Sequence, residues 1–249
     1  MYEYQYDPDQ DTKLHEGSKC FFANDLSVRT TVVQLDTQQG LVQIKLGPRV
    51  PEGPAQVSLI PDEYVRANVI ADAVLRYVDA WWHETEISRA IDDLVHRRSP
   101  RIDGHQAGPI IPPGANQLEE LIDVVRRMDD TVLCIQGPPG TGKTYTAARA
   151  ICALLQDGKK VAVTANSHKV ILNLLRAVHN AAIEDGLQVS IVKVGGDSDD
   201  PLIESGDIQH LPKSNQTAGT LSGGAVVVGG TAWVFSRPEL QGTFDYLIV

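Results

Sequence analysis

The stretch GPPGTGKT, Gly137 to Thr144, sets the architecture that we predict for this chain. It fits the pattern G-x-x-x-x-G-K-[ST] of a phosphate-binding loop, in which glycines allow a tight turn and backbone N–H groups point at a phosphate. The apolar run TVLCI precedes it, and the alanine-rich run TYTAARAICALL follows it. A strand before and a helix after are the context that such a loop needs, so a chance glycine-rich turn is a poor alternative.

Strands and helices are predicted to alternate on both sides of this loop. Apolar β-branched runs predict strands at 131–135, 160–164, 188–194, 225–228 and 244–249. Three- and four-residue apolar spacing predicts helices at 117–128, 143–155 and 168–184. Residues 195–224 read as a polar excursion. Alternation at this spacing predicts an α/β domain over residues 117–249, with a parallel sheet and crossover helices.

Residues 1–62 have the pattern of a small β-barrel. Short alternating runs separated by turns predict strands at 19–22, 28–36, 41–46 and 55–60. The hairpin around Gly40 is the clearest feature, because both of its arms alternate. Strands of this length and spacing are typical of a small barrel.

A helical stalk is predicted for residues 63–98, where apolar residues recur every three or four positions. The pattern allows one long helix, or two helices broken near Glu84. Trp81 and Trp82 are adjacent and cannot both face one side. Core packing of both is the simpler expectation, and a contact surface for one of them is the alternative. The Pro- and Gly-rich segment 99–116 then predicts a linker.

Composition disfavours several classes of protein. The chain has 249 residues, 42% hydrophobic and 22% charged, with a formal net charge of −10 and no basic segment, which disfavours nucleic-acid binding by charge alone. Cys20, Cys134 and Cys152 are too few and too far apart for a disulfide framework, which predicts reduced thiols and a cytoplasmic location. No apolar run is long enough for a membrane helix, and the polar, acidic first residues are unlike a secretory signal.

The phosphate loop predicts a site for ATP and Mg²⁺. Lys143 is expected to reach the β- and γ-phosphates and the Thr144 hydroxyl to bind Mg²⁺, so these two residues form the catalytic set. The wider nucleotide-binding set consists of Gly137, Pro138, Pro139, Gly140, Thr141, Gly142, Lys143, Thr144 and Tyr145. Such a loop predicts nucleotide binding but leaves open how the energy of hydrolysis is used.

A second polar cluster, TANSHK from Thr164 to Lys169, follows the predicted strand 160–164. The carboxyl edge of a parallel sheet faces the ligand crevice, where hydroxyls and helix-start N–H groups can hold phosphates. The alternative is that Asn166 or Ser167 merely caps the next helix.

Three segments together, GPPGTGKT, VAVTANSHKVILNLL and VVVGGTAWVFSRPELQGTFDYLIV, resemble the first motor domain of superfamily 1 helicases of the 5′-to-3′ subgroup. The chain is most similar to bacterial nuclease-helicase proteins that carry an AAA domain. This resemblance implies a RecA-like P-loop NTPase fold preceded by a small β-barrel and a long helical stalk. It implies the ATP-binding part of an ATP-dependent helicase or translocase on a single-stranded track, DNA in preference to RNA. It also implies that a nuclease domain can share the full-length chain.

The resemblance extends to site residues. In the family, the segments that match 164–167 and 230–233 contact single-stranded nucleic acid, and a glutamine upstream of the phosphate loop reads the adenine. The corresponding residues here are Gln117 for adenine, and Thr164, Asn166, Ser167, His168, Thr231 and Trp233 for nucleic acid. We also expect the barrel to contact nucleic acid or to brace the channel.

Two departures from the family pattern affect these expectations. Leu172 stands where relatives tend to carry an aspartate, so that contact is absent or moves to Asn173. Relatives continue from a strand like FDYLIV, residues 244–249, into an Asp-Glu pair that holds Mg²⁺ and activates water. We therefore expect a fragment truncated before the Walker B acids, which binds adenine nucleotide weakly and hydrolyses it negligibly. The full-length protein is expected to be a strand-stimulated ATPase.

Other polar residues are given structural interpretations. His168 and His179 lack acidic partners at metal-ligand spacing. The run 197–200 fits a solvated acidic loop with Asp197, Asp199 and Asp200. Two rival functions stay open: a P-loop ATPase or kinase that ignores nucleic acid, and a protein-binding module switched by nucleotide. No membrane partner is expected.

Overall fold

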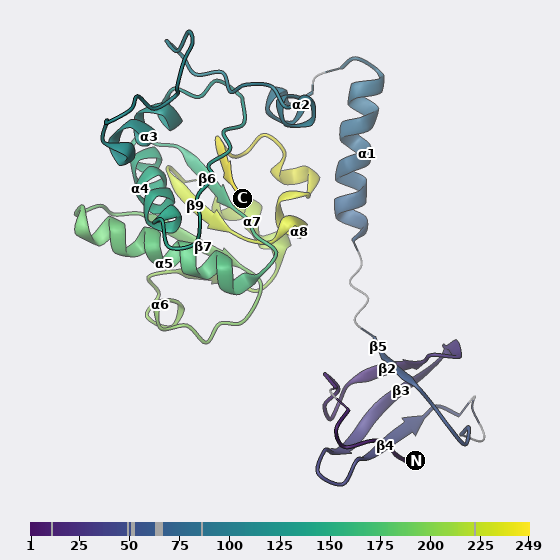
Figure 1. Cartoon of the computed structure of the whole chain (residues 1–249). Helices are drawn as coiled ribbons and strands as arrows, with labels where there is room; N and C mark the ends of the chain where they lie inside the picture. The colour runs from purple at the N-terminus through teal and green to yellow at the C-terminus, as the bar shows by residue number, and fades with distance from the viewer. Residues whose placement is uncertain (11, 49, 51–52, 63–66, 86, 222) are drawn as a thin grey trace. The chain divides into compact units, whose positions relative to one another are not determined.

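A computed structural model describes the chain apart from residues 11, 49, 51–52, 63–66, 86 and 222. The chain divides into two compact units, Met1–Arg66 and Ala67–Val249 (Figure 1). Among the described residues, no helix combines the length and the apolar character that crossing a bilayer requires.

The first unit is a five-stranded antiparallel sheet in the order β1-β4-β3-β2-β5. Its strands are β1 (Tyr2–Gln5), β2 (Lys19–Phe22), β3 (Asp25–Asp36), β4 (Leu41–Leu46) and β5 (Leu59–Pro61). Alternate residues of the central strands point inward and form one buried cluster, made of Cys20, Phe22, Val32, Val42 and Ile44. The predicted strands 19–22, 28–36 and 41–46 are confirmed as β2, β3 and β4 of this sheet.

The turn at Gly40 joins β3 and β4 as expected. Gly40 has φ of +65°, and a Cβ atom there would lie 2.3 Å from the Tyr6 carbonyl oxygen, so glycine is required for the close approach. Strand β1 was not predicted, because its alternating YEYQ lies within an acidic, polar segment. The Tyr4 hydroxyl donates to the Pro54 carbonyl at 2.9 Å, which folds the approach to β5 over β1. In the described residues β1 and β5 each pair with one neighbour, so barrel closure stays a prediction.

The predicted stalk contains two helices, α1 (Asn68–Trp82) and α2 (Arg89–His96). The helix α1 ends at Trp82, with His83 as its C-cap, and Glu84 has φ of +51°. The Ser88 hydroxyl caps α2 by accepting from the Ile91 N–H. Of the two alternatives that the sequence allowed, the break near Glu84 is therefore correct.

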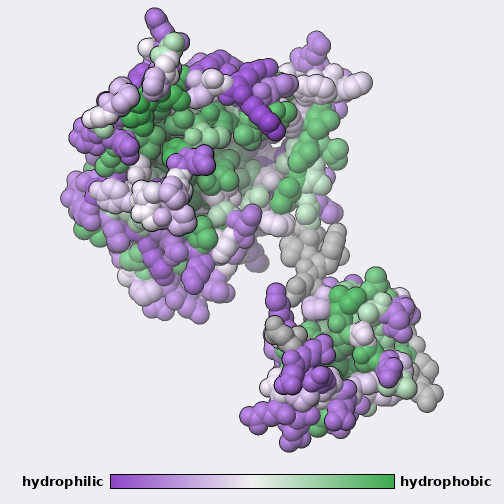
Figure 2. All heavy atoms as spheres, viewed as in Figure 1, coloured by the Kyte–Doolittle hydropathy of each residue, from purple (hydrophilic) through white to green (hydrophobic). Residues whose placement is uncertain are grey.

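Helix α1 lies on the surface of the second unit. Arg76 donates to the Ser236 carbonyl at 2.8 Å, but no residue of α1 is buried. Trp81 is 52% exposed and Trp82 is 74% exposed. The expectation that both tryptophans pack in a core is wrong, because they lie in the last turn of a surface helix. Figure 2 shows apolar residues along the exposed side of α1.

The centre of the second unit is a five-stranded parallel sheet in the order β10-β6-β9-β7-β8. Its strands are β6 (Lys160–Val163), β7 (Ser190–Val194), β8 (Gln209–Leu211), β9 (Val226–Gly229) and β10 (Tyr246–Ile248). The main helices are α3 (Gln117–Arg126), α4 (Lys143–Gln156) and α5 (His168–Glu184). Shorter elements are α6 (Pro201–Glu204), the 3₁₀ helix η1 (Ser214–Gln216), α7 (Thr217–Thr220), α8 (Ala232–Phe235) and the 3₁₀ helix η2 (Pro238–Leu240).

Helices cover both faces of this sheet. On one face, alternate strand residues such as Val161 and Val227 pack in a core with α3, α4 and α5. On the other face, residues such as Val192 and Val228 pack with Val234 of α8 and with η2. The predicted α/β fold with a parallel sheet is confirmed, and β-branched strands buried on both sides explain why the sequence signal was strong.

Two details of this unit differ from the prediction. Residues 131–135 precede the phosphate loop but form no strand, because none of them pairs with a strand of the described sheet. Ile135 is 56% exposed. In addition, the excursion 195–224 contains the short strand β8, which pairs with β7.

Candidate nucleotide site and nucleic-acid edge

The phosphate loop joins the segment 131–136 to α4, and its shape is set by glycine. Gly142 caps α4 with φ of +80°. A Cβ atom on Gly137 would lie 2.7 Å from the Thr141 hydroxyl, which itself donates to the Pro138 carbonyl at 2.9 Å. The first intrahelical bond runs from the Thr146 N–H to Gly142. The N–H groups of the first turn of α4 therefore lie at an exposed surface, in a geometry that suits an anion.

Lys143 lies over this loop. Its Nζ donates to the Gly137 carbonyl at 2.6 Å and to the Pro138 carbonyl at 2.9 Å. These contacts hold the cation at the mouth of the loop, beside the exposed Thr144 hydroxyl. A bound phosphate would take the place of the two carbonyls as the partner of Lys143.

Gln117 begins α3 and is exposed. At the other end of α3, Arg126 pairs with Asp157, the last-turn cap of α4, at 2.7 Å. The carboxyl ends of α3 and α4 therefore lie together, and the two packed helices run in the same direction. Gln117 thus lies on the side of the unit where the phosphate loop begins α4.

Two loop tips lie side by side at the carboxyl edge of the sheet. Beyond β6, the Thr164 N–H donates to the Ile248 carbonyl at 2.8 Å. Beyond β9, the Gly230 N–H donates to the Val163 carbonyl at 2.9 Å. Because α4 also begins at this edge and returns to start β6, the phosphate loop and both tips share one edge of one sheet (Figure 1).

The residues of the first tip differ in accessibility. Asn166 and Ser167 are exposed, while Thr164 is half-buried. The Ser167 hydroxyl caps α5 by accepting from the Lys169 N–H at 3.2 Å. The capping role that the sequence left open therefore applies to Ser167.

His168 is held beneath a neighbouring loop. A Cβ atom on Gly196 would lie 2.6 Å from the His168 ring, so only glycine allows this contact. The Nδ1 atom of His168 is buried and has no hydrogen-bond partner in the structure. Burial and the charge of Lys193 lower the pKa of His168. Its ring therefore lies under the loop rather than at the open edge.

Lys193 is a residue that sequence reasoning missed. Its side chain is 1% exposed, and Nζ donates to the carbonyls of Gly195 at 2.6 Å and Asp197 at 2.8 Å. Burial lowers the pKa of Lys193, and the negative charges of Asp197 and Asp200 partly oppose this shift. A lysine within the apolar run SIVKV was the available signal, because a strand buried on both faces leaves no solvent side for a cation.

The acidic loop near Lys193 is only partly solvated. Asp200 is 3% exposed, pairs with Arg176 and caps α6 by accepting from the Leu202 N–H at 3.0 Å. Burial alone would raise the pKa of Asp200, but the hydrogen bonds and the charge of Arg176 outweigh it, so the pKa lies below its usual range. The expectation of a solvated loop is wrong for Asp200, because the aspartate stabilises the start of α6.

In the second tip, Thr231 is half-buried and is the N-cap of α8, and Trp233 is 37% exposed. Close packing beneath this tip requires glycine, because a Cβ atom on Gly229 would lie 2.6 Å from Ile171. The tip is therefore fixed to α5, the helix that carries the first tip.

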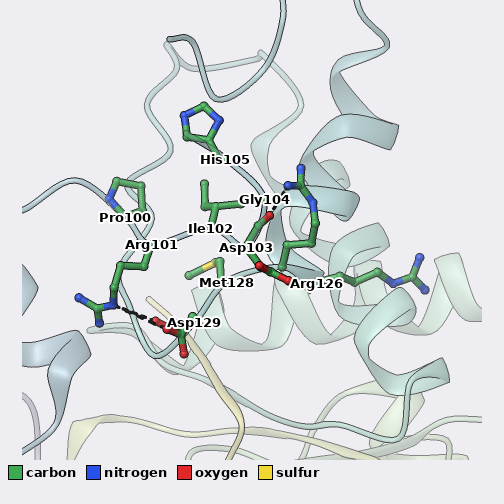
Figure 3. A pocket seen from close by; sticks show the side chains of 10 residues that line it. Pro100, Arg101, Ile102, Asp103, Gly104, His105, Arg126, Met128 and Asp129 are labelled. Carbon is green, nitrogen blue, oxygen red and sulfur yellow. Dashed lines mark hydrogen bonds and ion pairs between the residues drawn. The ribbon is translucent and has the colours of Figure 1, made fainter. Parts of the chain in front are cut away.

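A cavity of about 720 Å³ lies elsewhere (Figure 3). It is lined by residues 100–105 and 126–129, at the start of the segment that leads to the phosphate loop and so at the opposite sheet edge. Its arginines are engaged: Arg101 contacts Asp129, Arg126 pairs with Asp157, and Arg127 pairs with Asp123. The cavity is therefore not the nucleotide cradle.

Within the described part of the chain, no group of three or more His, Cys, Asp or Glu side chains is arranged to hold a metal ion. Within the phosphate loop, the exposed Thr144 hydroxyl is an oxygen atom that suits Mg²⁺.

Residues 115–219 match the family model described as AAA domain. The chain is also 35% identical over 118 residues to the DNA replication ATP-dependent helicase/nuclease DNA2 of Saccharomyces cerevisiae. That alignment covers 44% of this chain and 7% of the yeast protein, so the chain spans a small part of that relative. The AAA-domain match includes the phosphate loop, and both matches agree with the resemblance drawn from the motifs.

Proposed function

We propose that this chain, a superfamily 1 helicase-like protein, forms the ATP-binding part of a motor. The motor would move along single-stranded nucleic acid, DNA in preference to RNA. One observation carries the proposal: the phosphate loop and two accessible loop tips share the carboxyl edge of one parallel sheet. An edge of this kind is where ligands of open α/β sheets bind.

The residues of the loop fit ATP with Mg²⁺. The first-turn N–H groups of α4 and the glycine-shaped loop would hold the phosphates, and Lys143 would leave its two carbonyls to neutralise them. Thr144 would hold Mg²⁺, which when bound supplies positive charge to the phosphate oxygens. Gln117 would read the adenine from the amino end of α3.

The nucleic-acid track would run over the two tips. Asn166 and Ser167 offer exposed polar groups at the start of α5, and Trp233 offers a partly exposed indole on which a base can stack. Thr164 and Thr231 are half-buried, so we assign them backbone and hydroxyl contacts at the base of the tips. His168 would act by supporting the tip, since its ring lies under the Gly196 loop.

The first unit offers a cationic face that supports a contact with nucleic acid. Lys19 and Lys45 both lie opposite Thr31 in the strand register, and Arg29 lies on the same face, 5.1 Å from the Phe21 ring. A cavity of about 340 Å³ includes all three cations. Residues 1–62 contain only five lysines and arginines, at 13, 19, 29, 45 and 49, so three of five gather on one face of an acidic segment.

We further propose a nuclease domain in the full-length protein, a cytoplasmic location, and weak nucleotide binding by residues 1–249. A nuclease domain in the full-length protein is suggested by the name of the yeast helicase/nuclease, of which only 7% is aligned. A cytoplasmic location is suggested by cysteines 20, 134 and 152, which are free. Weak nucleotide binding with negligible turnover by residues 1–249 remains a prediction. Binding can be measured even when turnover is negligible.

The test measures nucleotide binding first, by titration of a fluorescent ATP analogue with Mg²⁺. Lys143→Ala should abolish binding, whereas Lys159→Ala, which removes a half-buried lysine at the opposite sheet edge, should leave it unchanged. Equal effects of the two substitutions would contradict the nucleotide site.

The second measurement asks whether the track is nucleic acid. In the full-length protein, ATP hydrolysis should rise when single-stranded DNA is added, and the paired change Asn166→Ala with Ser167→Gly should weaken that stimulation without weakening nucleotide binding. Glycine retains most of the capping preference at position 167. Hydrolysis that is indifferent to DNA and RNA would favour the P-loop kinase or ATPase alternative, and a nucleotide-dependent protein partner would favour the binding-module alternative.

A further inference from the structure

Lys193 lies near the end of β7, on the face of the sheet that packs against α5. Ile191, two residues earlier, belongs to the core cluster that contains α5, and alternate residues of a strand share a face. In the strand register Lys193 lies opposite Gly229 of β9 and His210 of β8. The lysine, 1% exposed, is therefore inside the α/β unit, next to the carboxyl edge that carries the two tips.

A third loop, residues 195–200, leaves the sheet at this edge, and Lys193 holds its beginning. The Lys193 Nζ donates to the Gly195 carbonyl at 2.6 Å and to the Asp197 carbonyl at 2.8 Å. The Gly195 N–H donates to the Leu211 carbonyl of β8 at 2.8 Å. The lysine side chain thus turns back onto the chain that follows it and fixes the path of the loop.

The far end of the third loop is held by α5. Asp200, which is 3% exposed, pairs with Arg176 of that helix. Two cations therefore fasten the loop, Lys193 of β7 at its beginning and Arg176 of α5 at its end. Neither cation is needed to form the strand or the helix that carries it.

Between these two points the third loop covers the base of the first tip. A Cβ atom on Gly196 would lie 2.6 Å from the His168 ring, and His168 directly follows the Ser167 cap at the start of α5. The second tip is also close, because a Cβ atom on Gly230 would lie 3.5 Å from Val194, the neighbour of Lys193. The position of the third loop therefore bears on both tips.

We propose that Lys193 is a positioning residue for the nucleic-acid track, because it fastens loop 195–200 over His168. The loop in turn holds the tip formed by Asn166 and Ser167 in the shape that a single strand requires. The inference rests on the proposed function and adds a residue that does not touch the strand. Since Lys193 is buried, a phosphate does not reach its Nζ, and the lysine acts through backbone carbonyls.

The first experiment uses Lys193→Met in the full-length protein. Methionine has a similar length and suits a strand that is buried on both faces, and Asp200 keeps Arg176 as its partner. The variant should therefore unfold at a temperature no lower than that of the unaltered protein.

Its response to nucleic acid should nevertheless change. The concentration of single-stranded DNA that half-saturates ATP hydrolysis should rise about five- to tenfold, the scale of one or two lost hydrogen bonds. The maximal rate and the half-saturating concentration of ATP should stay unchanged. A purely structural role would instead lower the unfolding temperature and impair the response to ATP and DNA together.

The salt dependence of DNA binding separates positioning from direct contact. If Lys193 touched a phosphate, its loss would lower the slope of log affinity against log salt by about one. We expect the slope of Lys193→Met to equal that of the unaltered protein, because the number of phosphate contacts does not change.

A second pair of variants displaces the third loop without altering Lys193. Gly196 and Gly206 have φ of +67° and +86°, so alanine strains the backbone at both positions. Only at Gly196 would the added Cβ collide with His168, whereas nothing lies within 4 Å of the Cβ position at Gly206. Gly196→Ala should raise the half-saturating DNA concentration, and Gly206→Ala should not.

The outcomes separate this inference from the function on which it rests. An unchanged half-saturating DNA concentration in Lys193→Met, or a loss that comes with a lower salt slope, would overturn the positioning role and leave the motor intact. Equal effects of Gly196→Ala and Gly206→Ala would do the same. If hydrolysis by the unaltered protein did not respond to single strands, the proposed function would fall and this inference with it.

Discussion

Arg101 and Asp93 form an ion pair that joins two parts of the second unit: Nη1 of Arg101 lies 2.8 Å from Oδ1 of Asp93, whose side chain is 1% exposed. The Thr131 hydroxyl donates to the same carboxylate at 2.8 Å. These hydrogen bonds, first from Arg101 and then from Thr131, hold the pKa of Asp93 below its usual range. The segment predicted as a linker is thereby anchored to α2 and to the approach to the phosphate loop.

Arg101→Met should therefore destabilise the protein more than Asp93→Asn. The first change leaves a buried carboxylate with only the more distant Arg98, at 3.7 Å, as its cation. The second leaves a neutral amide that still accepts from Thr131 and an arginine that is 31% exposed. Chemical denaturation measures the difference. Asp123→Asn, which removes an exposed i,i+4 pair with Arg127, is the control and should have little effect. The reverse order for Arg101 and Asp93 would contradict the buried pair.

Gly229→Ala should cost about 1–3 kcal/mol of stability, the range expected for overpacking. The added Cβ would lie 2.6 Å from Ile171 and 2.8 Å from Leu175, so β9 and α5 would have to move apart. Gly223→Ala is the matched control, because nothing lies within 4 Å of the position where its Cβ would be. Thermal unfolding of both variants checks the prediction, and similar midpoints would show that the contact is looser than described.

Stability should fall as the pH drops below about 6.5, the ordinary pKa of histidine. The folded protein lowers the pKa of His168, first by burial and then through Lys193, while Asp197 opposes and His210 adds to the shift. The unfolded chain therefore takes up the proton more readily, and the stability that is present above pH 6.5 is lost as the pH falls towards the lowered pKa.

Denaturation midpoints at about pH 7.5 and about pH 5.5 measure this loss. His168→Gln should reduce the difference between the two pH values, and His15→Gln, which alters an exposed histidine of the first unit, should not. An undiminished pH difference in His168→Gln would assign the effect to other groups.

The cationic face of the first unit gives a prediction about nucleic acid. Replacing Lys19 and Lys45 together by glutamate should weaken binding of single-stranded DNA by the full-length protein and make it less dependent on salt, because each lost phosphate contact lowers the slope against log salt by about one. Lys13→Glu alters an exposed lysine outside this face and is the control. Equal losses from both changes would point to a general charge effect.

Much of the α/β unit could be predicted because its signals are local. The phosphate loop and the helices beginning at Gln117, Lys143 and His168 start at the predicted residues. Capping side chains of Asn116 and Ser167 mark two of these starts in the sequence itself.

What could not be predicted depends on partners distant in the sequence. The run TVLCI has strand character, but a strand needs a hydrogen-bonded neighbour, and composition does not say whether one is present. Tryptophan is a residue type that is often buried, so the sequence favours core packing of Trp81 and Trp82. Which side of a helix stays exposed depends on the segments that pack against it, and both tryptophans of α1 stay exposed. Asp200 looks like a solvated acid until α5 brings Arg176 to it.

The candidate site follows the same division. Lys143 and Thr144 could be placed from the loop motif, whereas the contacts of Lys143 with loop carbonyls could not. The burial of His168 and Lys193 depends on how the loop 195–197 folds back over α5, and only the glycines at 195 and 196 hint at it.

The helix α5 connects the exposed tip at Ser167 with helix α4 at Arg149. It begins at the Ser167 cap in the exposed tip and ends beside Arg149 of α4. With 17 residues at 1.5 Å each, it is a stiff rod about 25 Å long. The Arg149 ion pairs therefore join α4, which begins at the phosphate loop, to the helix whose other end carries the Ser167 tip.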